Sequence, residues 1–306
     1  MPQPTYPVKQ VDPPLPPRET LPTMYDLPSE NPEEPGLPDE YHDLQPQLLS
    51  RTLRSPSYPP QRIFTGTDIN LYYDVRHTQW YKRPDWFLVV GVPRLYEERD
   101  LRSSYVVWQE GVNPFVVVEL LSPGTAKEDL GDYAEVEEEG ERGRAREGEN
   151  AGARETLPRK WDVYEKILRV PYYLVFSRYT NRVRFFKLVG GHYQEQALDP
   201  ENPRIWIPEL EVGLGLWQGE YEGIERKWLR WYDDQGNWIP TDTEQERQEK
   251  EQERQRAEQA ESQLQQVVSQ LEQIVLNLLQ QGMTVEQVAR ITGFSEEQVQ
   301  RLSEES

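Results

Sequence analysis

The run Phe115-Val116-Val117-Val118-Glu119-Leu120-Leu121 constrains the fold of this chain most strongly. Its apolar residues are continuous rather than alternating, which is typical of a strand buried on both faces in the middle of a sheet. A carboxylate at the end of such a strand is costly to desolvate unless it binds a cation or pairs with another group. Glu119 is therefore both part of a predicted core and a candidate functional residue.

Other segments predict the rest of an α/β domain over residues 46–240. Short β-branched and aromatic runs bounded by Gly, Pro, Asn or Asp predict further strands at 69–73, 86–90, 105–108, 172–176 and 183–188. Residues 160–169 predict a helix that ends before Pro171, with Trp161, Tyr164 and Leu168 on one face. We therefore expect a restriction-endonuclease-like mixed sheet flanked by helices.

Two segments do not have the composition of a core. Residues 1–45 are rich in proline and acidic residues, which predicts a largely disordered tail, with a short helix beginning near its end. Residues 126–158 contain a charged, low-complexity stretch, which predicts a disordered surface insertion.

The C-terminal third predicts helices. Residues 241–282 pass from a Glu/Gln/Arg-rich segment to apolar residues in 3-4 alternation, which predicts a short coiled coil and a homo-oligomer formed through it; the apolar residues are Leu264, Val267, Leu271, Ile274 and Leu278. Residues 283–306 predict a small helix-turn-helix-like piece, with Thr284 and Ser295 as N-caps and a capping box from Ser295 to Gln298. Because its second helix is acidic, a packing role is favoured over DNA reading.

Composition excludes several classes of site. The chain has no cysteine, so disulfides and Cys-ligated zinc are excluded, and its three histidines are scattered and unpaired in the sequence. A net charge of −20 repels nucleic acid, so a nucleic-acid ligand would need a local basic groove or bound cations. Since no apolar run approaches 18 residues, we expect a soluble, cytoplasmic protein without a membrane partner.

A second carboxylate accompanies Glu119. Asp85 immediately precedes the apolar run 86–90, so two carboxylates lie at the ends of two predicted buried strands. Either could cap a turn or pair with an arginine, but two in one small sheet favour a shared cation. Oxygen ligands with retained waters suit Mg²⁺ or Mn²⁺.

These residues stand in a pattern that resembles a known family. The segments Arg83-Pro84-Asp85, 117–125, Lys160-x-x-x-Tyr164 and Val170-Pro171-x-Tyr173 are similar to those of the Uma-type restriction endonucleases of the PD-(D/E)XK superfamily. The resemblance covers about residues 62–220. It implies a Mg²⁺-dependent endonuclease with DNA as its substrate, whose metal is held by Asp85, Glu119 and the backbone carbonyl of Leu120.

The resemblance also implies a catalytic lysine, although the usual position two residues after the glutamate is Leu121. In the Uma-type family the lysine lies on the following helix, where the matching residue is Lys160, and Lys127 is the alternative. Glu40 resembles an additional acidic residue near the metal. The competing hypothesis is a catalytically idle nuclease-like domain that serves as an oligomeric interaction protein.

Overall fold

A computed structural model describes residues 39–122, 125–136 and 157–304, together with the single residue 13. The predicted tail up to residue 38 and most of the predicted insertion, 137–156, lie outside the described residues. The chain divides into two compact units, 1–239 and 240–306, and each is described by itself. In the part of the chain that the structure describes, no helix has both the length and the apolar character needed to span a membrane.

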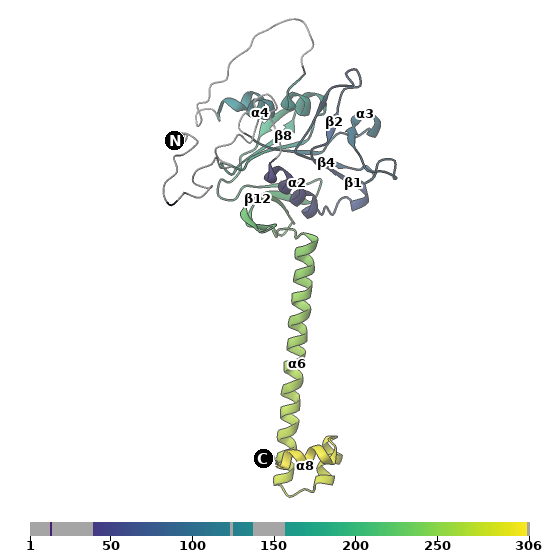
Figure 1. The fold of residues 1–306 in the computed structure, drawn as a ribbon, viewed down its shortest axis with the longest axis vertical. Coiled ribbons are helices and arrows are strands. Elements are labelled where there is room, and N and C mark those ends of the chain that lie inside the picture. Colours follow the sequence, from purple (N-terminus) through teal and green to yellow (C-terminus); the bar gives the residue numbers. More distant parts are fainter. Residues whose placement is uncertain (1–12, 14–38, 123–124, 137–156, 305–306) are drawn as a thin grey trace. The chain divides into compact units, whose positions relative to one another are not determined.

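A mixed sheet of six strands organises the first unit, as counted over its described residues (Figure 1). Strand β6 (Val116–Leu120) lies inside this sheet and all five of its residues are buried, which confirms the prediction from the continuous apolar run. It pairs antiparallel with β4 and parallel with β7. The strand order is β1 (Ile63–Gly66), β4 (Trp86–Val90), β6, β7 (Tyr172–Ser177), β8 (Arg182–Val189) and β9 (His192–Glu195).

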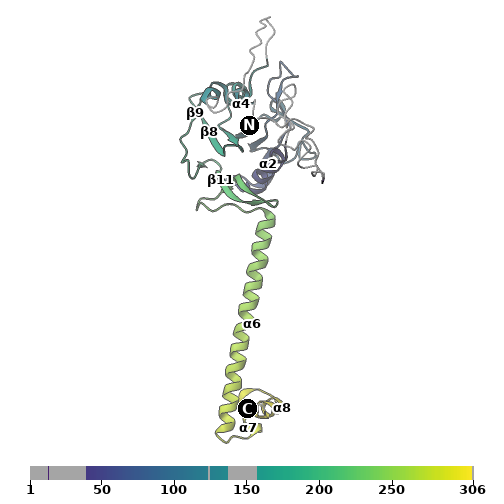
Figure 2. The same cartoon turned by 60° about the vertical axis from the view of Figure 1, so that its left-hand side comes forward.

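One face of the central sheet packs against α2 (Glu40–Thr52), the short helix expected near the end of the Pro-rich tail. Asp39 caps this helix by accepting a hydrogen bond from the backbone N–H of His42, at 3.1 Å. A second sheet lies beyond α2 and completes this half of the core, which contains Trp228 and Trp231 (Figures 1 and 2). Its strands are β10 (Arg204–Ile207), β11 (Val212–Tyr221) and β12 (Ile224–Tyr232).

The other face of the central sheet buries a second cluster of aromatic and aliphatic side chains. The helix predicted over 160–169 forms here as α5 (Lys160–Asp162), which continues into the wider π-helical turn η3 (Val163–Ile167). Trp161, Tyr164 and Leu168 are buried, as predicted. The remaining elements of this half are β2 (Asn70–Tyr72), β3 (Tyr81–Lys82), β5 (Ser104–Val106), α3 (Val107–Glu110), α4 (Ala126–Leu130) and η2 (Gly131–Val136).

Two segments differ from the prediction. The strand predicted at 105–108 forms as β5 but ends at Val106, because the chain then turns into α3, and the glycine at 111 ends that helix in the left-handed region. Residues 126–136, assigned to the charged insertion, fold as α4 and η2, and Leu130 and Ala134 are buried in the core. The charged composition of this segment gave no indication that its few apolar residues would be buried. The strand β1 and the short turn η1 (Pro60–Arg62) before it were also not predicted.

The second unit consists of α6 (Asp242–Gln280), α7 (Val285–Thr292) and α8 (Glu296–Glu304). Figure 2 shows α7 and α8 packed against the C-terminal end of α6, where Val275, Val288 and Val299 form a small core. The predicted capping box is confirmed, because Ser295 and Gln298 each accept a hydrogen bond from the backbone N–H of the other. This unit therefore has a core of its own.

Gln45 connects α2 to the second sheet. Its buried amide accepts a hydrogen bond from the Leu229 backbone N–H at 2.8 Å and donates one to the Leu229 carbonyl at 2.9 Å. We predict that Gln45→Leu lowers the free energy of unfolding by about 2–4 kcal/mol, because both backbone groups lose their partner. The same exchange at the half-buried Gln47 should change it by less than about 0.5 kcal/mol. Urea unfolding measures both, and equal effects would contradict the assigned role.

Candidate metal and nuclease site

The register of β4 and β6 brings the two predicted carboxylates together. Trp86 pairs with Val118, so the next position along each strand places Asp85 opposite Glu119. Directly opposed residues of an antiparallel pair project to the same face of the sheet. The Asp85 backbone N–H lies 3.3 Å from Glu119 Oε2, and the Leu120 N–H donates to Asp85 Oδ2 at 2.6 Å. Both carboxylates are thereby fixed at the end of β6.

Two side chains of α5 and η3 contact Glu119. Lys160 Nζ lies 2.9 Å from Glu119 Oε2, and the Tyr164 hydroxyl donates to Oε1 at 2.8 Å. Residues four apart lie on the same side of a helix, so one helical segment serves both oxygens of the carboxylate. Glu119 is fully buried, and these two donors supply the hydrogen bonds that water would otherwise provide.

Asp129 joins the cluster and was missed by the sequence analysis. After β6, the Thr125 N–H donates to the Ser122 carbonyl at 3.2 Å, and this turn leads into α4. Asp129 on α4 is buried, and its Oδ1 lies 3.4 Å from Lys160 Nζ without a hydrogen-bond partner among the described residues. The signal in the sequence was its place just after a Ser–Thr turn, but its charged neighbours resembled an insertion.

Glu128 holds the start of α5 in place. One of its carboxylate oxygens accepts from the Lys160 backbone N–H at 2.9 Å and from Lys82 Nζ at 2.5 Å. Lys82 is buried, which shows that it is not an ordinary surface charge. These bonds fix the backbone of the residue whose ammonium contacts Glu119.

His42 approaches the site from α2, on the other side of the sheet. Its Nε2 lies 3.2 Å from the Leu120 carbonyl and its Nδ1 lies 2.8 Å from Asp39 Oδ1. Both partners only accept hydrogen bonds, so the ring satisfies both when it is protonated. Burial lowers the pKa of His42, but the Asp39 carboxylate and Asp85 outweigh burial and raise it. The raised pKa favours the protonated, positively charged ring beside the carboxylates.

Burial dominates the electrostatics of the carboxylates. It raises the pKa of Glu119 to about 7 and that of Asp129 to about 6, although Lys160 opposes both shifts. It also raises the pKa of Asp85. For Lys160, burial lowers the pKa, but Asp129, Glu119 and Asp85 outweigh it and raise the pKa well above its usual value. The cluster holds more carboxylate than one ammonium can neutralise, so it favours a further cation.

The oxygen atoms of this cluster fit a hard divalent ion. Within the described ranges, however, no group of three or more His, Cys, Asp or Glu side chains is close enough together to hold a metal ion by itself. Asp85, Glu119 and the Leu120 carbonyl supply only oxygen, which suits Mg²⁺ or Mn²⁺. The buried Oδ1 of Asp129 is a further oxygen that has no hydrogen-bond partner among the described residues. This combination makes the cluster a candidate metal site.

The other predicted site residues lie apart from these contacts. Lys127 and Glu40 are both exposed, Lys127 on α4 and Glu40 at the start of α2. The side chain through which α2 contacts the end of β6 is that of His42 rather than that of Glu40. The geometry therefore favours Lys160 over Lys127 as the lysine of the site.

A family model described as "Uma2: Putative restriction endonuclease" matches residues 15–218, two thirds of the chain. The chain belongs to the Uma2 family. Uma2 membership supports a nuclease-like function in general, and the match spans every residue of the cluster. The comparison with curated proteins found no match.

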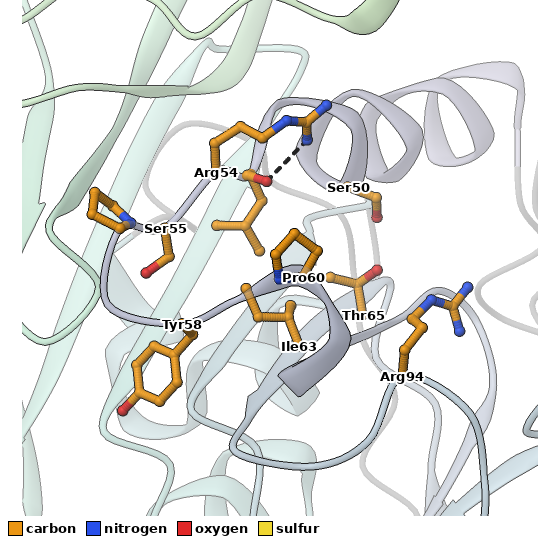
Figure 3. A pocket seen from close by; sticks show the side chains of 10 residues that line it. Ser50, Arg54, Ser55, Tyr58, Pro60, Ile63, Thr65 and Arg94 are labelled. Carbon is orange, nitrogen blue, oxygen red and sulfur yellow. Dashed lines mark hydrogen bonds between the residues drawn. The ribbon is translucent and has the colours of Figure 1, made fainter. Parts of the chain in front are cut away.

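A separate pocket of about 680 Å³ lies between the end of α2 and β1 (Figure 3). Its apolar wall includes Leu53, Tyr58 and Ile63, and the side chains of Arg54 and Arg94 lie at its edge. The lining residues named for this pocket include no carboxylate, so it is distinct from the carboxylate cluster around Glu119.

The raised pKa of Glu119 predicts how stability depends on pH. Between its ordinary value of 4.5 and about 7, the folded protein retains a proton that the unfolded chain has lost. The free energy of unfolding should therefore fall as pH rises from 5 to 7 in EDTA, and this slope should be smaller in Glu119→Gln. Chemical unfolding at several pH values measures it.

Glu195 provides the control. Hydrogen bonds from Arg184 lower the pKa of Glu195, so its stabilising contribution is lost only as pH falls below its ordinary value of 4.5. Glu195→Gln should destabilise the protein without changing the slope between pH 5 and 7. An unchanged slope in Glu119→Gln would contradict the assignment of the shifted proton.

Proposed function

We propose that this chain is a Mg²⁺-dependent endonuclease that hydrolyses phosphodiester bonds of DNA, with Asp85, Glu119 and Lys160 as its catalytic residues. The observation that carries the proposal is the convergence of Asp85 and Lys160, from two different segments, on Glu119 Oε2. This oxygen lies 3.3 Å from the Asp85 backbone N–H and 2.9 Å from Lys160 Nζ. Membership of the Uma2 family supports it.

Each residue of the site has a separate role in this proposal. Asp85, Glu119 and the Leu120 carbonyl would hold Mg²⁺ or Mn²⁺, which when bound supplies positive charge that acidifies a water molecule and stabilises the negative charge of the transition state. Lys160 would orient the attacking water or stabilise the developing anion.

Tyr164 positions Glu119. Burial and the Glu119 carboxylate raise the pKa of Tyr164 well above its usual range, so its hydroxyl keeps the proton that it donates. Donation to one oxygen leaves the other facing Lys160 and Asp85. Tyr164 therefore acts through Glu119 rather than on the substrate.

Cleavage of supercoiled plasmid DNA tests the proposal. We predict activity in Mg²⁺ or Mn²⁺ that stops in EDTA and falls at least about 100-fold in Asp85→Asn, Glu119→Gln and Lys160→Met, because each removes a charge from the site.

Matched exchanges serve as controls for this assay. Asp74→Asn changes an acidic residue whose carboxylate pairs with His77, and Lys127→Met changes the exposed lysine. Both should retain activity within about threefold. Full activity in Asp85→Asn, or loss of activity in Lys127→Met alone, would reject the assigned roles.

The second candidate function is an oligomeric interaction protein with a nuclease-like domain. The observation that favours it is an exposed apolar row on α6, where Leu264, Val267 and Ile274 are 64%, 51% and 48% exposed. Their 3-4 spacing matches the seam of a coiled coil, so a second copy of α6 would cover them.

Sedimentation of the full chain tests self-association. We predict that the native chain sediments as an oligomer and that the double variant Leu264→Glu/Val267→Glu sediments as a monomer, because charges at a seam are costly to bury. Gln265→Glu, an exposed polar position on the same helix, should leave the mass unchanged. A monomeric native chain would exclude this function without bearing on DNA cleavage.

A further inference from the structure

A cluster of positive side chains lies on the α2 side of the candidate site. Strands β6 and β7 are parallel, so their carboxyl ends meet at one edge of the sheet, where Glu119 pairs with Val175. Arg178 follows directly after β7 at this edge, and His42 contacts the Leu120 carbonyl from α2. In a chain with a net charge of −20, positive groups beside a cluster of carboxylates need an explanation.

Arg178 is held by contacts that orient its guanidinium. Its Nη2 forms an ion pair with Asp39 Oδ2 and donates to the Tyr179 hydroxyl at 2.9 Å. Its Cζ lies 4.7 Å from the centre of the Tyr179 ring and 5.9 Å from that of Tyr41. The side chain remains 24% exposed, so part of it is in contact with solvent.

Arg226 supports Arg178 from β12. Its guanidinium stacks on the Tyr41 ring at 4.3 Å, and its Nη2 donates to the Arg178 carbonyl at 3.3 Å. Planar guanidinium groups stack on aromatic rings while keeping their donors in the ring plane. The backbone of Arg178 is thereby fixed as firmly as its side chain.

Asp39 is the acidic partner common to this cluster. One of its oxygens accepts from the backbone N–H and Nδ1 of His42, and the other pairs with Arg178. Burial raises the pKa of Asp39, but His42 and Arg178 outweigh burial and lower it to about 2. This carboxylate therefore presents an anionic oxygen to the guanidinium, as a phosphodiester does.

We propose that Arg178 is a substrate-positioning residue that binds a phosphate of the nucleic-acid strand next to the cleaved bond, and that Asp39 occupies its guanidinium until the strand arrives. This inference rests on the proposed nuclease function. It provides the local basic contact that the net charge requires. Two other arginines of the domain are buried and committed to internal partners, Arg184 to Glu195 and Arg230 to the Ile239 carbonyl.

Binding of a fluorescently labelled DNA duplex to the full chain tests the inference, measured by anisotropy in the Asp85→Asn background so that binding is separated from cleavage. Arg178→Met should weaken binding about tenfold and reduce the slope of log K against log salt by about 1. Arg178→Lys should restore part of the affinity because it keeps the charge. Arg256→Met on α6, an exposed arginine, removes the same charge and should change neither quantity.

Asp39→Asn supplies an independent readout if Arg178→Met fails to fold. Asparagine is an equally good helix N-cap, so α2 is retained while the competing charge is removed. DNA binding should become a few-fold tighter, whereas a merely structural ion pair would make it weaker or leave it unchanged. Equal affinities for Arg178→Met and Arg256→Met, or weaker or unchanged binding by Asp39→Asn, would overturn the inference. Absence of cleavage by the native chain with these binding effects intact would reject the nuclease proposal alone.

Discussion

Burial of the Glu119 carboxylate within the central sheet is the constraint on which the site depends. A charged group at such a position is stable only if donors or cations surround it. The fold brings Asp85, Lys160 and Tyr164 to it from one neighbouring strand and one helix. Each of these elements also contributes apolar residues to the core. The same packing that forms the core therefore supplies the groups that stabilise the buried Glu119 carboxylate.

The two sides of the sheet contribute different charges to this region. The α4 and α5 side brings Asp129 and Lys160, whereas the α2 side brings His42, with Arg178 at the end of β7. An oxygen-rich cluster suited to a divalent cation therefore lies beside groups suited to an anion. That combination suits a phosphodiester, the substrate class that we propose, because a bound metal and the cationic side chains would meet different parts of its charge.

Much of this was predictable from residue patterns. The continuous apolar run at 115–121 gave the buried strand with Glu119, and the 3.6-residue periodicity at 160–169 gave the helix that carries Lys160. The family resemblance singled out Lys160, and membership is confirmed. The sequence did not indicate the roles of Asp129 and His42. His42 contacts the carbonyl of Leu120, which is 78 residues away in the chain, and no local sequence pattern predicts such a contact. The folding of 126–136 escaped notice because two or three apolar residues among charges do not create a period.

The sequence by itself determined most of the segments that bury their side chains and two of the carboxylates that could serve a metal, because hydrophobic periodicity and side-chain chemistry are local properties. Only the tertiary structure decided which of these residues meet. The strand register placed Asp85 opposite Glu119, and the parallel pairing of β6 with β7 brought Arg178 to the same edge. Register and strand order arise from packing between distant segments, and one residue of slippage would have turned Asp85 to the other face.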